Sequence, residues 1–504
     1  MFYSEKLTSF VIFHNQIFIR NCFRAINIKM NTSTRQIKNT KKFEKELKLI
    51  EEFNTLDNHE INLVGHEEVE TRISKREKRI NLEIKARIAD DTETENFVFI
   101  LGKNSYETKK LGNNSSHSEI KVNKSANFST TLEINSFYSL DFNQNGIFKA
   151  LYPINIKEIK TFHTEFETIT HQRNGTEYFY DCIRININGT PYDLTQLKYN
   201  KSGFYIIECL AEQTFEEFTE ATFSIRQAVG FINRLMVGDE EYIFDNLGKL
   251  YYSNYIRPTI KGMYSPITTN PYSYPDIEKE IADKFYGKLT RITLKSLSNL
   301  ANKIHSDPEF STAILVILEA TSIRSLLLIP SSFAVIIELL SKNINKEEIT
   351  SEIPIEDKKL KKKVIEEFHE VIDKNSHTLN EKSILKLKRR LNEINKPVHK
   401  QRLTNNEKLT RPFEQLGLKL SLQDITIIEH RNELLHGNIL LKKDDDQNDD
   451  DINRYMGYVS AKLFTLISKL ILKSIGYNGY VYNQAKYLEK QMKIETNEQY
   501  FERI

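Results

Sequence analysis

The sequence predicts an α+β fold in which an antiparallel β-rich half precedes an all-helical half. Between about residue 80 and residue 212, apolar and polar residues alternate with a period of two, which is typical of strands with one buried face. From residue 276 to residue 490, apolar residues recur every three or four positions, which is typical of packed helices. We therefore expect a sandwich or an open barrel followed by a helical bundle.

The composition indicates a water-soluble chain with more than one domain. Its 504 residues are too many for one core, and 39% of them are hydrophobic and 28% charged. The net charge of +2 means that a nucleic-acid partner would have to meet a local basic patch. The three cysteines, Cys22, Cys182 and Cys209, are far apart and form no CxxC pair. This spacing argues against a zinc site or a disulfide framework, so we expect no metal, no cofactor and a cytoplasmic location.

The first 40 residues are expected to be an extension outside the fold. Their apolar start is interrupted by His14, Asn15 and Gln16 and has no small-residue cleavage site, so a signal peptide is not expected. No run in the chain approaches the roughly 18 apolar residues of a membrane span. Met30 begins a polar stretch and is an alternative translation start to Met1.

The β-rich domain is expected over residues 41–262. A helix over residues 41–53 comes first, with one apolar face formed by Phe43, Leu47, Ile50 and Phe53. Strands follow at residues 79–88, 96–102, 129–137, 182–194 and 203–212. Asn174-Gly175 and Asn188-Gly189 predict tight turns between strands. A helix over residues 218–236, with Gly238 as its stop signal, and a last strand or hairpin over residues 241–256 complete this domain.

A proline-rich linker over residues 263–275 is expected to separate the two domains. Pro266, Pro271 and Pro275 exclude both a helix and a central strand there. The helical domain then covers residues 276–490, and residues 491–504 are expected to be a tail. Its helices are predicted at residues 296–306, 311–344, 362–372, 381–394, 421–439 and 455–477.

Two charged segments lie inside the helical domain. Residues 358–402 contain 14 lysines and arginines against 6 aspartates and glutamates, an excess of 8. Ordinary solvated helix faces and an RNA-facing surface both explain this excess. The acidic run at residues 444–451 is interpreted as a solvated loop, with metal binding or self-inhibition as alternatives.

The motifs of several large enzyme classes are absent. The sequence contains no GxxxxGK[ST], GxGxxG, HExxH or GxSxG pattern that would carry a phosphate loop, a dinucleotide fold, a zinc protease or an α/β-hydrolase. The best remaining chemical candidate is the stretch IIEHRNELLHGNILL at residues 427–441. It places two histidines, an arginine and an asparagine within seven positions of an otherwise apolar helix.

This helix is expected to begin at a capping box formed by Ser421 and Asp424. Its apolar stripe is predicted to consist of Ile425, Ile428, Leu435 and Ile439. Asn432 interrupts the stripe, and His436 follows about one turn later on the same face. Arg431 and His436 are about 140° apart around an ideal helix, so they converge only if the arginine side chain reaches round. The structural alternative is that Arg431 extends to water and His436 is a hydrogen-bonded core histidine.

The segment RNELLHG resembles the R-polar-x-x-x-H signature of HEPN-domain ribonucleases, with Arg431, Asn432 and His436 at the signature positions. The preceding segment SILKLKRRLNEINKP and the later segment LILKSIGYNGYVYN resemble the flanking helices of large bacterial HEPN proteins. The likeness covers about 210 C-terminal residues. A β-rich half before a C-terminal HEPN domain is similar to the layout of ApeA-type anti-phage proteins, and layout is all that the β-rich half shares.

The resemblance implies an endoribonuclease that cleaves RNA by 2′-OH attack without a metal ion. It also implies a homodimer whose paired HEPN domains each supply one Arg-Asn-His set, acting as an abortive-infection effector. The β-rich half would sense a phage-derived trigger, and the products would carry 2′,3′-cyclic phosphates. Arg431, Asn432 and His436 are the expected catalytic residues, whereas His430 is interpreted as a surface or rim residue. The alternatives are a HEPN protein that binds RNA or a nucleotide without cutting it, and a scaffold whose β domain carries the function.

Overall fold

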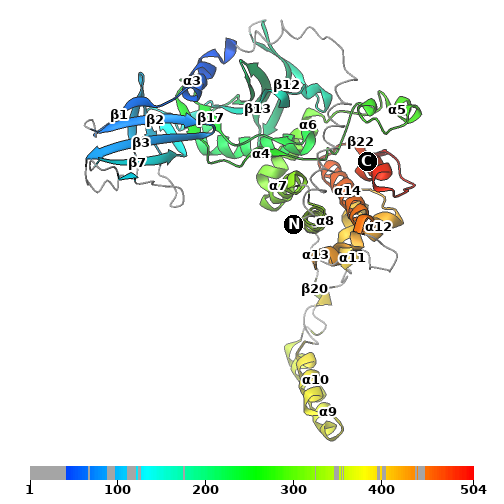
Figure 1. The fold of residues 1–504 in the computed structure, drawn as a ribbon. Coiled ribbons are helices and arrows are strands. Elements are labelled where there is room, and N and C mark those ends of the chain that lie inside the picture. The colour runs from blue at the N-terminus through cyan, green and yellow to red at the C-terminus, as the bar shows by residue number, and fades with distance from the viewer. Residues whose placement is uncertain are drawn as a thin grey trace. The chain divides into compact units, whose positions relative to one another are not determined.

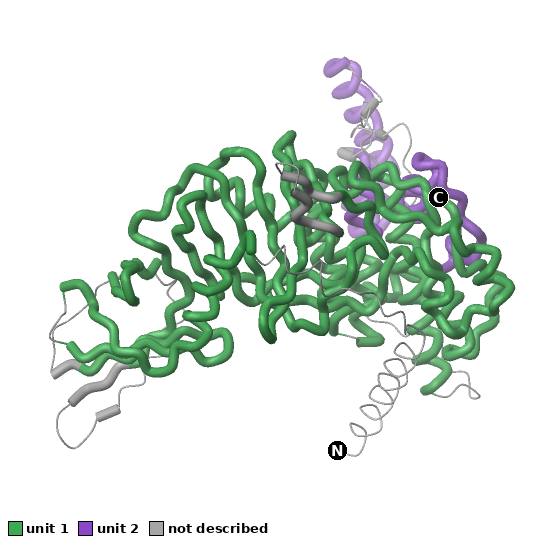
Figure 2. Tube along the Cα trace, turned by 90° about the horizontal axis from the view of Figure 1, so that it is seen from above, with its two compact units in different colours: residues 1–336, 430–504 green, residues 337–429 purple. Residues whose placement is uncertain are grey.

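The structure is a computed structural model (Figure 1), and it describes most of the chain. The described residues are 41–65, 69–87, 97–109, 121–122, 127–173, 176–323, 325–344, 351–352, 355, 357–393, 398–399, 405–436, 440 and 449–504. They form two compact units (Figure 2), one containing residues 1–336 and 430–504 and the other residues 337–429. The extension over residues 1–40, Cys22 and the Asn174-Gly175 turn lie outside the described residues, whereas Cys182 and Cys209 are buried free thiols.

The predicted α+β class is confirmed, with one large antiparallel sheet in the N-terminal half. In order across the sheet, the strands are β11 (Ile169–Arg173), β12 (Thr176–Ile187), β13 (Thr190–Tyr199), β14 (Ser202–Cys209), β10 (Lys149–Asn155), β17 (Glu241–Phe244), β18 (Leu250–Ser253), β8 (Ser136–Ser139), β5 (Asn104–Thr108), β4 (Val98–Leu101), β1 (His59–Leu63), β2 (Glu70–Arg76), β3 (Arg79–Arg87), β7 (Asn127–Ile134) and β6 (Lys121–Val122). β11 and β6 are its two ends, so over the described residues the sheet is open.

The turn predicted at Asn188-Gly189 joins β12 to β13. Both residues have positive φ, 50° and 87°, as a two-residue hairpin turn requires. The strand register continues directly from it, with Ile187 opposite Thr190. This turn sets the pairing of two of the longest strands in the sheet.

Helix α3 (Glu44–Asn54) supplies the apolar face that its spacing predicts. Phe43, Leu47, Ile50 and Phe53 are all at most 1% exposed and belong to one core cluster with residues of the sheet. The ring of Phe53 lies 5.2 Å from that of Phe137 in β8. The helix therefore closes the core between strands that are distant in the sequence.

Helix α4 (Phe215–Asn233) ends earlier than the sequence suggests. Its C-cap is Arg234, which has a left-handed φ of 70°, so Gly238 is not the stop signal. Gly238 serves a close approach instead, because a Cβ there would lie 2.0 Å from the carbonyl oxygen of Arg257. Sequence spacing cannot distinguish these two uses of glycine.

A buried lysine joins β2 to the segment that precedes β17. The Nζ of Lys75 lies 2.6 Å from a carboxylate oxygen of Glu240, and their side chains are 2% and 9% exposed. Lys75 also donates hydrogen bonds to Tyr242 at 2.6 Å and to Asn54 at 2.7 Å, and Tyr252 donates to Glu240 at 2.9 Å. Burial lowers the pKa of Lys75, while the charge of Glu240 acts in the opposite direction.

The helices of the larger unit pack against this sheet and against one another. They are α5 (Lys279–Phe285), α6 (Leu294–Ser306), α7 (Pro308–Ile323), the first part of α8 (Leu328–Ile344), α13 (Arg431–Leu435), α14 (Asp449–Ser474) and α15 (Gln484–Met492). Helices α6 and α7 contact α4, and α6 also contacts β12. The sheet and most of the C-terminal helices therefore share one compact unit. The boundary between the two units does not coincide with the change from strand-like to helical periodicity in the sequence.

The expected linker and tail are packed segments in this unit. Ser265 in the linker donates a hydrogen bond to the carbonyl oxygen of Ile232 at 2.9 Å. At the C-terminus, β23 (Phe501–Arg503) pairs with β22 (Tyr480–Tyr482). Two buried lysines of α14 hold the C-terminal segment, Lys462 through Glu498 at 2.6 Å and Lys469 through Glu502 at 2.5 Å.

Helix α14 is long and apolar enough to meet the length and hydropathy criteria for a membrane span. Within the described residues it is the one helix that does so, and 89% of its most apolar window is buried inside the protein. Its apolar side chains are therefore covered by the fold.

The smaller unit contains the end of α8 together with α9 (Lys358–Lys374), α10 (Glu381–Glu393), α11 (Asn405–Gln415) and α12 (Leu422–Glu429). A short pair of strands, β20 (Ser351–Glu352) and β21 (Val398–His399), flanks the α9–α10 pair in the sequence. The six residues 375–380 connect α9 to α10, so these two helices form an antiparallel hairpin.

We predict that Glu240→Gln lowers the free energy of unfolding by about 3 kcal/mol, because it leaves the buried Lys75 cation without its carboxylate. Equilibrium unfolding in urea measures this loss. The matched control is Lys78→Gln, which removes the Lys78–Asp239 pair, whose lysine side chain is 58% exposed. The control should cost less than about 1 kcal/mol. Equal effects of the two substitutions would show that the buried pair contributes no more to the free energy of unfolding than the exposed pair.

Candidate functional site

The candidate site begins at the predicted capping box of α12, which the structure confirms. The backbone N–H of Ser421 donates to Asp424 Oδ2 at 2.8 Å, and the N–H of Asp424 donates to Ser421 Oγ at 3.1 Å. The segment does not continue as one helix, because α12 ends at Glu429 and α13 begins at Arg431. The cluster of polar residues thus lies on a short separate helix.

The predicted apolar stripe is wrong beyond this interruption. Ile428 is buried as expected, but Leu434 is buried in place of Leu435, which is 38% exposed. Ile439 lies outside the described residues. Ile427 and Leu434 are both buried and lie seven positions apart, on one side of an ideal helix, so the buried face follows them and not the stripe counted from Ile425. As a result Asn432 is exposed and does not interrupt a buried face.

The structure brings two of the three predicted catalytic residues together. Arg431 is half-buried, and its Nη1 donates a hydrogen bond to Asn432 Oδ1 at 2.8 Å. His436 caps the C-terminal end of α13, where its backbone N–H donates to the carbonyl oxygen of Asn432 at 3.1 Å. Its imidazole is exposed and has no hydrogen bond to a residue that the structure describes. His436 is therefore not a core histidine.

His430 is half-buried and is held by a residue that the sequence did not single out. Its Nε2 lies 2.8 Å from the hydroxyl oxygen of Tyr455 in α14, and the two rings meet edge to face. Burial raises the pKa of Tyr455, so its hydroxyl remains protonated at neutral pH. The two residues are 25 positions apart, and no short-range pattern connects them. This contact fixes the residue immediately before Arg431.

The first turn of α8 provides a second support for α13. Ser331 Oγ donates to the carbonyl oxygen of Leu434 at 3.2 Å. The segments that meet at this contact, residues 323–335 and 431–435, carry six large apolar side chains that are between 38% and 68% exposed. We call them the apolar face: Ile323, Leu326, Leu327, Leu328, Val335 and Leu435. The polar residues of α13 therefore lie beside a surface that is unusually apolar for exposed residues.

Other charged groups in this unit have partners of their own. Glu319 in α7 forms an ion pair with Arg257 at 2.5 Å. Of the acidic run, only residues 449–451 are described, and they form the first turn of α14, where Asp451 pairs with Arg454 at 2.9 Å. Acidic residues at a helix N-terminus are stabilised by the helix dipole. In the part of the chain that the structure describes, no three His, Cys, Asp or Glu residues cluster as metal ligands do.

Comparisons of this chain with protein-family models, with curated proteins and with solved structures gave no match.

We predict that Tyr455→Phe lowers the free energy of unfolding by about 1 kcal/mol, because it removes the hydrogen bond to His430 in a half-buried setting. Equilibrium unfolding in urea measures the change. Tyr255→Phe is the matched control, because the side chain of Tyr255 is 83% exposed and its substitution should stay within about 0.5 kcal/mol of wild type. A Tyr455→Phe protein as stable as wild type would contradict a supporting role for this contact.

Proposed function

We propose that this chain is a metal-independent endoribonuclease of the HEPN type that acts in the cytoplasm. The observation that carries the proposal is that Asn432 and His436 are exposed, and Arg431 is half-buried, on or at the end of one short, well-supported helix. A set of polar residues kept at the surface beside an apolar face favours contact with another molecule over a structural role. The HEPN-like spacing of the same three residues supports the assignment to RNA cleavage.

The residue types match the needs of cleavage by the 2′-OH group. A histidine with an unperturbed pKa of about 6.5 can accept the proton of the 2′-OH or donate one to the leaving 5′-oxygen. The exposed imidazole of His436 is accessible for this exchange. The transition state gathers negative charge on the phosphoryl oxygens, which the guanidinium of Arg431 can stabilise with paired hydrogen bonds.

Asn432 would act as a positioning residue for Arg431. Its Oδ1 accepts a hydrogen bond from Nη1 of Arg431, which sets the direction of the guanidinium group. Asn432 thereby restricts an otherwise flexible arginine side chain without neutralising its positive charge. Pre-ordering of this kind reduces the entropy lost when substrate binds.

A second copy of the chain would complete the site. Within one chain, His436 and Arg431 are five positions apart on a short helix and do not meet through a hydrogen bond between their side chains. In the proposed homodimer, the apolar face of each chain would be buried against the other, and two copies of α13 would line one cleft. Burial of this face supplies the driving force for association. The β-rich half would then sense a phage-derived trigger, as in an abortive-infection effector.

We predict that His436→Ala and Arg431→Ala each reduce RNA cleavage at least 100-fold, because each removes a group that acts on the transition state. The measurement uses purified full-length protein, labelled single-stranded RNA and excess EDTA, with products tested for 2′,3′-cyclic phosphate ends. His59→Ala, which changes an exposed histidine of β1, is the control and should cleave like wild type. Cleavage that needs a divalent metal, or that survives in both variants, would overturn the proposal.

We also predict that Leu328→Asp converts the protein to a monomer and abolishes cleavage, because it places a charge in the apolar face, where Leu328 is 55% exposed. Sedimentation velocity measures the oligomeric state, and the RNA assay measures activity. Leu247→Asp is the matched control, since Leu247 is 72% exposed in the connection between β17 and β18. If the Leu328→Asp protein cleaves RNA normally as a monomer, the dimeric site is wrong.

A further inference from the structure

The α9–α10 hairpin has no core of its own. No residue of α9 is buried, although the helix carries six large apolar residues in its sequence. Phe368, Val371 and Leu387 are 44%, 56% and 39% exposed. A pair of helices can cover only part of each apolar stripe, so this hairpin leaves apolar surface open to a ligand.

The hairpin is strongly basic in a chain that is otherwise slightly acidic. Residues 358–393 contain 11 lysines and arginines against 6 aspartates and glutamates, an excess of 5. Because the whole chain has a net charge of +2, the remaining residues carry a net charge of −3. A local excess of this kind attracts polyanions and makes their binding dependent on salt.

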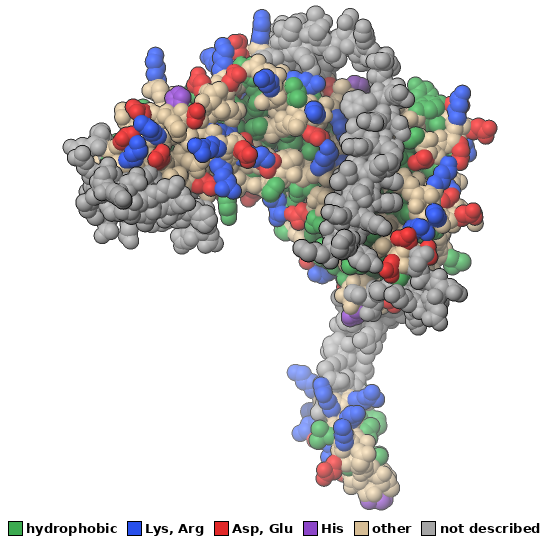
Figure 3. All heavy atoms as spheres, in the orientation of Figure 1, with side chains coloured by type: hydrophobic (Ala, Val, Ile, Leu, Met, Phe, Trp, Pro, Cys, Tyr) green, Lys and Arg blue, Asp and Glu red, His purple; other side chains and the backbone are tan. Residues whose placement is uncertain are grey.

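The cations are concentrated on the part of the hairpin away from its connecting turn. Five of the first six residues of α9 are lysines, and α10 has Lys388, Arg389 and Arg390 in its second half. Figure 3 shows Lys and Arg side chains crowded on this part of the hairpin. Lys362 and Lys363 have acidic neighbours one turn away, but these pairs are 3.8 and 4.0 Å long and largely exposed, so they neutralise little.

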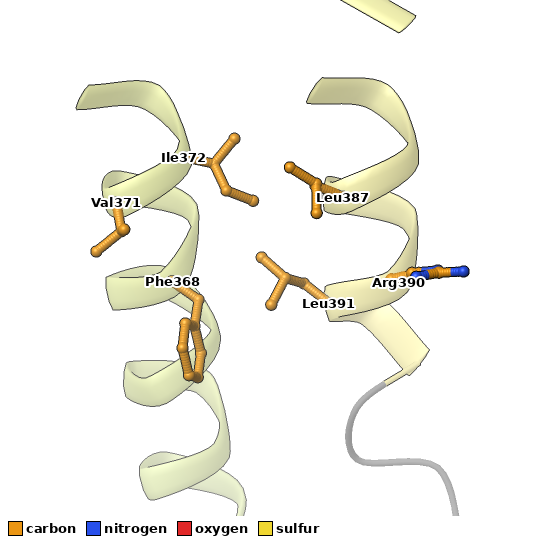
Figure 4. A pocket seen from close by; sticks show the side chains of 6 residues that line it. All are labelled: Phe368, Val371, Ile372, Leu387, Arg390 and Leu391. Atoms are coloured by element: carbon orange, nitrogen blue, oxygen red, sulfur yellow. The ribbon is translucent and has the colours of Figure 1, made fainter. Parts of the chain in front are cut away.

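A shallow hollow of about 300 Å³ lies on the same hairpin, between its two helices. Its lining is almost entirely apolar and consists of Phe368, Val371, Ile372, Leu387, Arg390 and Leu391 (Figure 4). Figure 4 shows Arg390 extending outward from α10, on the side away from α9. Lys361 lies seven residues, or about two turns, before Phe368 and thus on the same face of α9.

An aromatic ring flanked by cations is the arrangement that binds single-stranded nucleic acid. Unpaired bases stack on aromatic side chains, while lysine and arginine contact the phosphates between them. A second copy of the hairpin is a poorer occupant, because two surfaces that each carry an excess of 5 positive charges would repel one another. An ordinary duplex has no unstacked base to enter the hollow.

We infer that the α9–α10 hairpin binds single-stranded RNA, with a base against Phe368 and with Lys361 and Arg390 on the flanking phosphates. The inference rests on the proposed function in taking RNA as the polyanion, and it adds a binding site in a unit that does not contain Arg431, Asn432 or His436. Substrate recognition and cleavage chemistry would then be assigned to different parts of the chain.

The test measures RNA binding by full-length His436→Ala protein, so that cleavage does not interfere. Fluorescence anisotropy with a labelled 20-nucleotide single-stranded RNA gives the affinity at several salt concentrations. Adding Lys361→Gln and Arg390→Gln should weaken binding about tenfold and reduce the salt slope by about 1.4, the value for two single-strand phosphate contacts. Adding Phe368→Ala alone should weaken binding about fivefold or more while leaving the salt slope unchanged.

Two matched controls isolate the site. Lys374→Gln with Lys382→Gln removes the same charge at the turn end of the hairpin, and Leu385→Ala shortens a side chain that is 76% exposed and does not line the hollow. Both should bind RNA like the parent protein. Equal weakening by both charge pairs would overturn the defined site, as would a preference for duplex RNA or self-association of the hairpin in sedimentation.

The outcome is separable from that of the proposed function. If the Lys361→Gln/Arg390→Gln protein with an intact His436 binds and cleaves RNA like wild type, the inference about the hairpin fails and the nuclease proposal stands. If wild-type protein binds RNA through the hairpin but does not cleave it, the nuclease proposal fails and the hairpin site stands.

Discussion

The fold depends on a simple electrostatic constraint, which is that a lysine taken out of water must meet a carboxylate. Three buried or nearly buried lysines satisfy it with glutamates far away in the sequence: Lys75 with Glu240, Lys462 with Glu498, and Lys469 with Glu502. Leaving any of these charges unpaired would cost several kcal/mol of folding free energy. That is a large share of the net stability of a typical domain. The first pair joins β2 to the segment before β17, and the other two hold the C-terminal segment on α14.

The packing of α14 and α8 also determines how α13, which carries the candidate site, is held in place. Helix α14, kept in the interior, presents Tyr455 to His430, and α8 presents Ser331 to the carbonyl oxygen of Leu434. These two contacts hold the ends of α13 while its polar side chains remain outside. A short helix supported at both ends can keep Arg431 and Asn432 in contact without burying them. Functional groups held on a rigid support lose less entropy on binding than groups on a free loop.

Charge is distributed unevenly between the parts of the chain, and this distribution gives the two proposals a common physical basis. The hairpin holds an excess of 5 positive charges in residues 358–393, whereas the rest of the chain is slightly acidic. A nuclease with few cations at its catalytic helix needs another source of affinity for a phosphate backbone. A separate basic hairpin would provide that affinity and leave α13 free to act on one phosphodiester bond.

Periodicity, turn chemistry and capping were enough to predict the α+β class, the face of α3, the Asn188-Gly189 turn and the Ser421–Asp424 capping box. These features depend on residues within a few positions of one another, where spacing and local hydrogen bonding decide the outcome. The motif also identified Arg431, Asn432 and His436 as the candidate site. Only the tertiary structure decided that the helix breaks at His430 and that Tyr455 and Ser331 support the site. Those outcomes depend on segments 25 to more than 100 residues apart, whose contacts no local pattern encodes.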